Sequence, residues 1–271
     1  MTGGGYAMHR TERATSAPVA SSHPAPAVTV PRPRLAERIK SGTTAHDAKS
    51  DETVAVLAAP IVIRHTSEAA RLAARIRDVV VSALLLLLTL PLIVALAVAI
   101  SIDSRGGPIF AQARLGRDAK QFRFYKFRTM WVDARERFPE MYAYAYTPDQ
   151  IVDLRFKLVN DPRLTRIGRW LRRTSLDELP NLWNVLRGEM SLVGPRPEIP
   201  QMLPYYRAHQ MAKFAVKPGL TGMAQVNGRN IIPFQETLRH DLHYVASRTF
   251  LLDARILLRT VWVVVWQWGA L

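Results

Sequence analysis

The sequence lacks cysteine altogether among its 271 residues. Disulfide frameworks, thiolate-bound zinc or iron–sulfur sites and thiol nucleophiles are therefore excluded. The phosphate-binding pattern GxxxxGKS and the dinucleotide-binding pattern GxGxxG are also missing, so an ATPase or a dinucleotide-dependent enzyme has no support. The histidines His209, His240 and His243 are not at metal-ligand spacings, and we expect them to be ordinary surface or core residues.

Acidic side chains are scarce relative to basic ones. There are 22 Asp and Glu against 37 Lys and Arg, a formal net charge of +15. Residues 1–70 contribute only +2, and residues 71–271 contribute +13. Such a charge favours an anionic partner, which is a nucleic acid, an acidic lipid surface or a phosphorylated substrate.

The N-terminal segment has no apolar periodicity. Residues 1–52 are rich in Ala, Ser, Thr, Pro and Gly, and they bury too little apolar surface to offset the entropy of ordering. No apolar core region follows the first basic residues, so a signal peptide is not indicated. We expect residues 1–65 to form a disordered tail.

A long uncharged run follows, VVVSALLLLLTLPLIVALAVAI, over residues 79–100. A straight helix of this length extends over roughly 33 Å, enough to cross the hydrocarbon core of a bilayer. Pro91 lies near its middle and removes one helical hydrogen bond. Both flanks are basic, which suits a re-entrant hairpin with both ends in the cytoplasm, whereas an ordinary span usually has one basic flank. These observations leave a hairpin and a kinked span about equally supported.

The remainder, residues 104–271, predicts an α/β domain in which helix dominates and strand is sparse. Alternating aromatic residues favour a strand over 121–128. The last expected helix carries Trp262, Trp266 and Trp268, which suits either a membrane-surface helix or a core helix. The expected helices cover residues 133–146, 164–171, 182–186, 234–246 and 253–267.

The densest motif is TSLDELPNLWNVLRGEMSLVGPRP, residues 174–197, with adjacent carboxylates at Asp177 and Glu178. Ser175 and Glu178 match a capping box, which is a purely structural explanation. The same helix start also suits phosphate chemistry, because its free N–H groups attract anions. One carboxylate could then attack phosphorus while the other holds a metal ion.

Cations stand near this motif in stiff local frames. Arg172 precedes Asp177 by five residues, and prolines flank Arg196 on both sides. Arginine binds phosphate oxygens in a bidentate manner. Lys126 and Arg128 lie on the aromatic segment QFRFYKFR, where basic and aromatic interleaving also suits single-stranded nucleic acid.

Three long strings resemble the bacterial sugar transferases, the monotopic polyprenyl-phosphate hexose-1-phosphate (phosphoglycosyl) transferases. They are DSRGGPIFAQARLGRDAKQFRFYKFRTM, DPRLTRIGRWLRRTSLDELPNLWNVLRGEMSLVGPRPE and KPGLTGMAQVNGR, in the family's order. The resemblance implies transfer of a sugar-1-phosphate from a UDP-sugar to undecaprenyl phosphate, with Mg²⁺ as cofactor and UMP released. It also implies that glycan assembly, such as that of exopolysaccharide or capsule, begins with this step.

The resemblance assigns roles to individual residues. It implies that Asp177 is the nucleophile and forms an aspartyl-phosphosugar intermediate, and that Glu178 holds the metal together with Asp177. Lys126, Arg172 and Arg196 are implied to bind substrate phosphate.

Two further cations, Arg128 and Arg229, are candidate nucleotide- or sugar-binding residues. The family's membrane helix is re-entrant and broken at a proline, which favours the hairpin with its break at Pro91. The expected organisation is then a tail over 1–65, a re-entrant membrane hairpin over 66–103 and a catalytic domain over 104–271.

The resemblance places the catalytic domain on the cytoplasmic face of the bacterial inner membrane. Its expected partners are UDP-sugar, undecaprenyl phosphate and membrane lipids, with no nucleic acid, and a homodimer is compatible with the sequence. Two rival hypotheses are a membrane-tethered nucleic-acid binder and a non-catalytic assembly protein. The first leaves the carboxylate pair and the GPRP motif unexplained.

Overall fold

The computed structural model describes residues 67–266, apart from 156–157, 159 and 229–231. The expected disordered tail therefore lies outside the described residues. The elements, in chain order, are α2 (Glu68–Asp103), β1 (Ile109–Leu115), η1 (Arg117–Ala119), β2 (Gln121–Phe127), α3 (Ala134–Arg137), η2 (Pro139–Tyr142), α4 (Pro148–Val152), α5 (Arg166–Thr174), η3 (Leu176–Glu178), α6 (Asn181–Arg187), β3 (Ser191–Val193), η4 (Pro200–Tyr205), η5 (Ala208–Ala215), β4 (Gly219–Thr221), α7 (Met223–Asn227), α8 (Phe234–Ser247) and α9 (Phe250–Val265).

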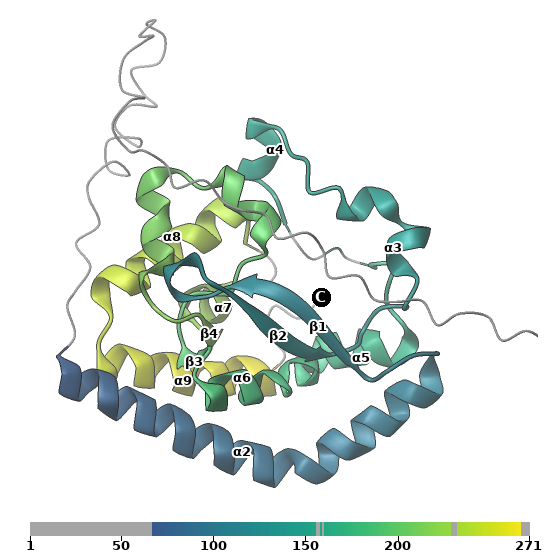
Figure 1. The fold of residues 1–271 in the computed structure, drawn as a ribbon, viewed down its shortest axis with the longest axis horizontal. Helices are drawn as coiled ribbons and strands as arrows, with labels where there is room; N and C mark the ends of the chain where they lie inside the picture. The colour runs from purple at the N-terminus through teal and green to yellow at the C-terminus, as the bar shows by residue number, and fades with distance from the viewer. Residues whose placement is uncertain (1–66, 156–157, 159, 229–231, 267–271) are drawn as a thin grey trace, which may run out of the picture. The chain divides into compact units, whose positions relative to one another are not determined.

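Helix dominates the described residues and strand is sparse, as predicted (Figure 1). Strands β1 and β2 form an antiparallel hairpin in which Ile109 is opposite Phe127. Strands β3 and β4 form a short parallel pair in which Val193 is opposite Thr221. The strand predicted over 121–128 is confirmed as β2.

The apolar run forms most of α2, one helix of 36 residues that continues through Pro91. The helix begins where the Ser67 side chain accepts a hydrogen bond from the Ala70 amide. Pro91 has no N–H group and cannot bond the carbonyl four residues earlier, which favours a kink. Figure 1 shows α2 bent, and the helix is continuous through Pro91.

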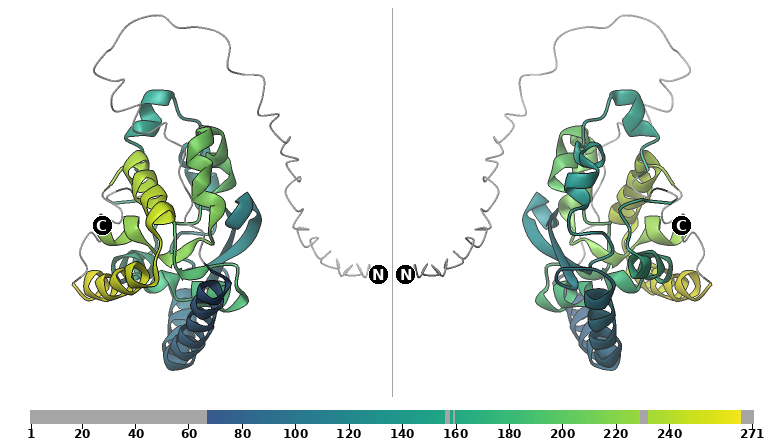
Figure 2. Two further views of the ribbon diagram at one scale, coloured as in Figure 1. Left: turned by 90° about the vertical axis from the view of Figure 1, so that its left-hand side faces the viewer. Right: turned by 90° about the vertical axis from the view of Figure 1, so that its right-hand side faces the viewer.

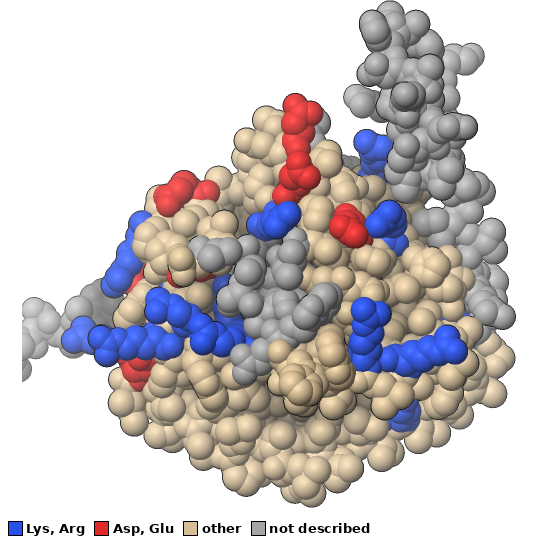
Figure 3. All heavy atoms as spheres, turned by 180° about the vertical axis from the view of Figure 1, so that it is seen from behind, with Lys and Arg blue, Asp and Glu red and all other residues tan. Residues whose placement is uncertain are grey.

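Helix α2 lies along one edge of the described residues, with the other elements on one side of it (Figures 1 and 2). It is the one helix in the described part that is long and apolar enough to cross a membrane, and only 11% of its most apolar window is buried. Its large apolar side chains, including Leu84, Leu87, Leu88 and Val94, are exposed. Figure 3 shows the molecule from behind. Its lower part is nearly free of charged side chains, and Lys and Arg side chains lie above that part.

Both halves of α2 are attached to the domain. In the N-terminal half, the Arg75 guanidinium donates to the carbonyls of Val185 and Leu186, each at 2.7 Å, where α6 ends. Near the other end, Leu96 and Ile100 pack in one buried cluster with Phe127 and Leu171. The two ends of the helix therefore contact the same folded unit.

A second attachment is ionic. Arg77 pairs with Asp253 of α9 at 2.9 Å, and Ser191 donates to the Asp78 carboxylate at 2.6 Å. The Tyr244 hydroxyl donates to Asp253 Oδ1 at 2.8 Å. This buried network ties α2 to α8, α9 and β3.

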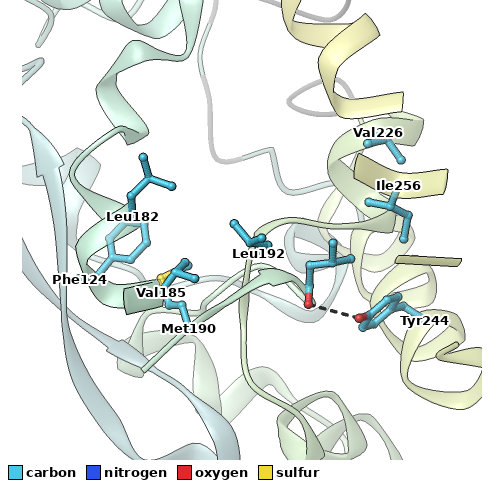
Figure 4. Packing of buried hydrophobic residues seen from close by; sticks show 9 residues of the cluster. Phe124, Leu182, Val185, Met190, Leu192, Val226, Tyr244 and Ile256 are labelled. Carbon is cyan, nitrogen blue, oxygen red and sulfur yellow. Dashed lines mark hydrogen bonds between the residues drawn. The ribbon is translucent and has the colours of Figure 1, made fainter. Parts of the chain in front are cut away.

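The largest apolar core lies between the β2–α6 side and the α7–α9 side of the domain (Figure 4). Tyr244 closes this core by hydrogen-bonding the Val193 carbonyl at 3.2 Å, drawn as a dashed line in Figure 4. Its buried members are Phe124, Leu182, Val185, Met190, Leu192, Val193, Val226, Tyr244 and Ile256.

Two expected helices differ from the structure. The helix predicted over 133–146 is wrong as a single element, because only Ala134–Arg137 is α-helical and a 3₁₀ turn begins at Pro139. A proline at that point cannot continue the backbone bonding of the first helix. The last helix, α9, begins at Phe250, and its Trp262 and Trp266 are exposed rather than buried in the core. Trp268 lies outside the described residues.

Candidate active site

The carboxylates of Asp177 and Glu178 meet the ammonium group of Lys126. Lys126 Nζ lies 2.6 Å from Glu178 Oε1 and 3.5 Å from Asp177 Oδ2. Lys126 comes from β2 and the two acids from η3, elements about fifty residues apart in sequence. Asp177 is buried, with 5% of its surface exposed. The fold thus brings together the acidic pair and one of the three predicted phosphate-binding cations.

The backbone at η3 explains how adjacent acids become available. Helix α5 ends at Thr174, and the next residue, Ser175, caps it in a left-handed conformation with φ of 61°. The chain then makes one 3₁₀ turn before Pro180 leads into α6. The Ser175 side chain does not cap η3, so the capping-box interpretation does not describe this turn. Successive 3₁₀ residues point about 120° apart, which lets Asp177 and Glu178 face different groups.

Arg196 approaches Glu178 from the GPRP turn. Its Nη1 lies 3.6 Å from Glu178 Oε1, and the guanidinium is about one-third exposed. The preceding Gly194 packs so tightly that a Cβ there would lie 2.5 Å from the Lys217 carbonyl oxygen. Only glycine fits this close approach of two backbones, and the turn therefore has a fixed path toward the acids.

Arg172 lies near enough to Asp177 for their charges to interact, and two other side chains hold its guanidinium in place. Its Nε donates to Thr129 Oγ1 at 3.2 Å, and its Nη1 donates to Asp161 Oδ2 at 3.3 Å. Burial lowers the pKa of Arg172, while the charges of Asp177 and Asp161 raise it in part. The guanidinium remains charged, because even a lowered arginine pKa stays far above neutrality.

Asp161 is a site residue that the sequence reasoning missed. It is fully buried and also binds Arg163 through two bonds of 2.8 Å. Burial alone would raise the pKa of the Asp161 carboxyl. The hydrogen bonds from Arg163 and the charge of Arg172 lower this pKa by more, so it lies below its usual value. The available signal was the DPR sequence at 161–163, an acid two residues before a buried arginine.

Arg128, one of the two candidate nucleotide- or sugar-binding cations, is directed away from the acids. The Arg128 guanidinium donates instead to backbone carbonyls at the end of α2, those of Ile100, Ser104, Arg105 and Gly106. This geometry gives Arg128 a structural role, as a cap for the helix. Arg229 lies outside the described residues.

A metal ion would find two protein ligands here. Within the described part of the chain, no group of three or more His, Cys, Asp or Glu side chains is placed to hold a metal. Asp177 and Glu178 nevertheless converge on one cation, the Lys126 ammonium. Mg²⁺ is commonly bound by one or two carboxylates together with substrate phosphates and water, so this pair fits Mg²⁺.

Comparison with known proteins agrees with this geometry. A family model described as "Bacterial sugar transferase" matches residues 69–267, most of the chain. This protein belongs to the bacterial sugar transferase family. The match includes α2, the carboxylate pair and the GPRP turn.

Three curated relatives illustrate the similarity. The chain is 42% identical over 207 residues to the UDP-galactose-lipid carrier transferase of Erwinia amylovora, covering 76% of this chain and 43% of that protein. It is 41% identical over 194 residues to the undecaprenyl-phosphate galactose phosphotransferase of Salmonella typhimurium, covering 71% and 40%. It is 40% identical over 181 residues to the uncharacterized sugar transferase EpsL of Bacillus subtilis, covering 66% and 81%. The chain thus spans about two fifths of the length of the first two relatives.

Proposed function

We propose that this sugar transferase moves a sugar-1-phosphate from a UDP-sugar to undecaprenyl phosphate. The proposal is supported by relatives whose names give this reaction for galactose or glucose. The observation that carries it is the convergence of the Lys126 ammonium on the carboxylates of Asp177 and Glu178. Adjacent acids paired with cations suit phosphoryl transfer, which depends on charge stabilisation and positioning.

The proposed reaction has two steps. An oxygen of the Asp177 carboxylate attacks the phosphorus bonded to the sugar, and the bond to the bridging oxygen breaks, so that UMP leaves with that oxygen. A phosphate oxygen of undecaprenyl phosphate then attacks the same phosphorus, and the Asp177 carboxylate is released. The product is an undecaprenyl diphosphate sugar, and the phosphorus carries the same number of oxygen bonds throughout.

The chain's own cations stabilise the charge that develops. Lys126 and Arg196, which pair with Glu178, are placed to exchange part of that pairing for phosphate oxygens. Arg172, which is fixed by Asp161 and Thr129, adds a positive charge near Asp177. Mg²⁺, when bound by Asp177 and Glu178, would neutralise charge on the diphosphate.

We also propose that α2 enters and leaves the membrane on one face. A helix of 36 residues is roughly 54 Å long, so an upright span would separate its ends across a hydrocarbon core of about 30 Å. The contacts of Arg75 and Ile100 instead attach both halves to one domain. The exposed apolar middle then lies in one leaflet, and the acidic pair stays on the cytoplasmic side.

The topology can be tested by labelling, because the chain contains no native cysteine. Single cysteines are placed at Ser67 and at Gly107, where an added Cβ meets no atom within 4 Å. We expect an impermeant thiol reagent to label neither site in intact cells and both sites after lysis. Labelling of one site from outside would show that α2 spans the membrane.

The reaction is tested by measuring UMP release from a panel of UDP-sugars with undecaprenyl phosphate and Mg²⁺. We expect one or a few UDP-sugars to give acceptor-dependent turnover and a lipid-linked diphosphate sugar. A folded, membrane-inserted protein that releases UMP from none of them would overturn the proposal.

A further inference from the structure

A buried cluster of charges is joined to the chain directly after the GPRP turn, because Glu198 follows Pro197. Its members are Glu198, Tyr206, Lys213 and Asp241, called the buried cluster below. Lys213 Nζ lies 3.3 Å from Glu198 Oε2, 3.2 Å from Asp241 Oδ2 and 3.0 Å from the Tyr206 hydroxyl. Lys213 is 3% exposed and Asp241 is fully buried.

The buried cluster is connected to the backbone that directly follows Arg196. Glu198 follows Arg196 by two residues, and its carbonyl accepts a 2.7 Å bond from the Leu115 amide of β1. Its carboxylate accepts a 2.8 Å bond from Tyr206 and is paired with Lys213. Asp241, on α8, joins this segment through Lys213, whose ammonium pairs with both Asp241 and Glu198.

The charges in this cluster do not balance. The pKa of Asp241 is raised to about 6, because burial and the charge of Glu198 raise it by more than Lys213 and the Arg196 main-chain N–H lower it. Two carboxylates thus share one ammonium away from water. Buried ion pairs add little net stability compared with apolar packing, and here they link Glu198, Lys213 and Asp241 from three separate segments of the chain.

A second support reaches the same turn from the β1–β2 hairpin. The Arg114 guanidinium donates to the Pro197 carbonyl at 3.1 Å and lies over the Phe124 ring. The residues directly after Arg196 are therefore held by Arg114 and by the buried cluster. The Arg196 side chain itself pairs with Glu178.

We propose that Lys213, Glu198 and Asp241 are positioning residues that hold the Arg196 guanidinium beside Glu178. The inference rests on the proposed function, because the position of Arg196 matters for activity only if that side chain binds a substrate phosphate. The cluster acts on Arg196 through the backbone of the turn.

A double-mutant cycle tests this directly. The full chain in detergent is titrated with UDP, and KM and kcat for UMP release are measured in parallel. The variants are Asp241→Asn, Arg196→Gln and the two combined, with Arg239→Gln as the control. Arg239 is on α8 like Asp241, but its ion pair with Glu236 is exposed.

We expect Arg196→Gln to weaken UDP binding about tenfold, as expected for loss of one charge-assisted hydrogen bond. Asp241→Asn should weaken UDP binding and raise KM more than it lowers kcat. In the Arg196→Gln background, Asp241→Asn should have little further effect, because the guanidinium that it positions is gone. Arg239→Gln should match the wild type.

The inference is overturned if Asp241→Asn binds UDP as the wild type does, or if its loss adds in full to that of Arg196→Gln. Asp241→Asn is isosteric, and its thermal midpoint identifies an effect that is merely structural. Normal wild-type turnover with additive losses would reject the positioning role and leave the proposed function standing. Non-additive effects on UDP binding in a protein that shows no turnover would support the positioning role and reject the proposed function.

Discussion

Replacing Asp161 by Asn removes the carboxylate charge that binds the guanidinium groups of Arg163 and Arg172. Asp161 is 1% exposed and accepts side-chain bonds from Arg163 at 2.8 and 2.8 Å and from Arg172 at 3.3 Å. The variant keeps the shape but turns an NH₂ group toward a guanidinium. Breaking a buried ion pair by changing one partner costs about 3–5 kcal/mol. We expect a loss of this size in the free energy of unfolding at pH 7.

The assay is denaturant unfolding in detergent, with Asp133→Asn as the matched control. Asp133 also pairs with an arginine, Arg137, at 2.8 Å, but both side chains are about half exposed. An exposed pair of this kind contributes roughly 0–1 kcal/mol. The same acid, at the same distance from an arginine, should therefore be several times more costly to change when buried.

The pH dependence gives the sign of the effect. The folded pKa of Asp161 is lowered, because its bonds to Arg163 and the charge of Arg172 outweigh burial. The unfolded chain therefore takes up a proton first as the pH falls. The difference between wild type and Asp161→Asn should be complete above about pH 4 and shrink below it, as the pH falls through the folded pKa. A difference no larger than that of Asp133→Asn, or one unchanged at pH 3, would refute the reasoning.

Two other substitutions test the supports of the site. Gly168→Ala would place a Cβ 1.9 Å from the Thr129 carbonyl oxygen, and should lower the free energy of unfolding by about 2 kcal/mol or more, whereas Gly107→Ala should not; equal thermal midpoints would contradict the packing. Arg128→Gln removes donors from the carbonyls at the end of α2, and should speed amide exchange in the last turn of that helix. Unchanged exchange there would show that the cap is dispensable.

The sequence predicts the elements with strong local patterns. The apolar run, the alternating strand over 121–128 and the periodic helix near Phe234 all appear close to their expected bounds. Each of these patterns is formed by residues close together in the sequence, and such local periodicity is the main signal of secondary structure. The expected helix over 133–146 fails because Pro139 interrupts the bonding that its helix-forming neighbours favour.

Side-chain placement is harder to predict, because it depends on distant segments. Lys126 and Arg128 are two residues apart and would share a face of an ideal strand. Strand β2 ends at Phe127, so Arg128 leaves that alternation and turns to the end of α2. The buried cluster shows no local pattern either, since its members lie on separate segments. Asp161 offers only the short DPR sequence, which does not reveal its second partner, Arg172 on α5. The placement of the acids beside Lys126 was expected from the family resemblance and not from spacing.

The central claim is that Asp177 is the nucleophile, and a single-turnover experiment tests it most directly. The enzyme is mixed with its preferred UDP-sugar and Mg²⁺ without undecaprenyl phosphate, and UMP is followed over time. We expect a burst of about one UMP per active site, because the phosphosugar stays on the carboxylate. Asp177→Asn, shown to be folded by its thermal midpoint, should give no burst and no sugar-linked protein. A burst of normal size from folded Asp177→Asn would contradict the account.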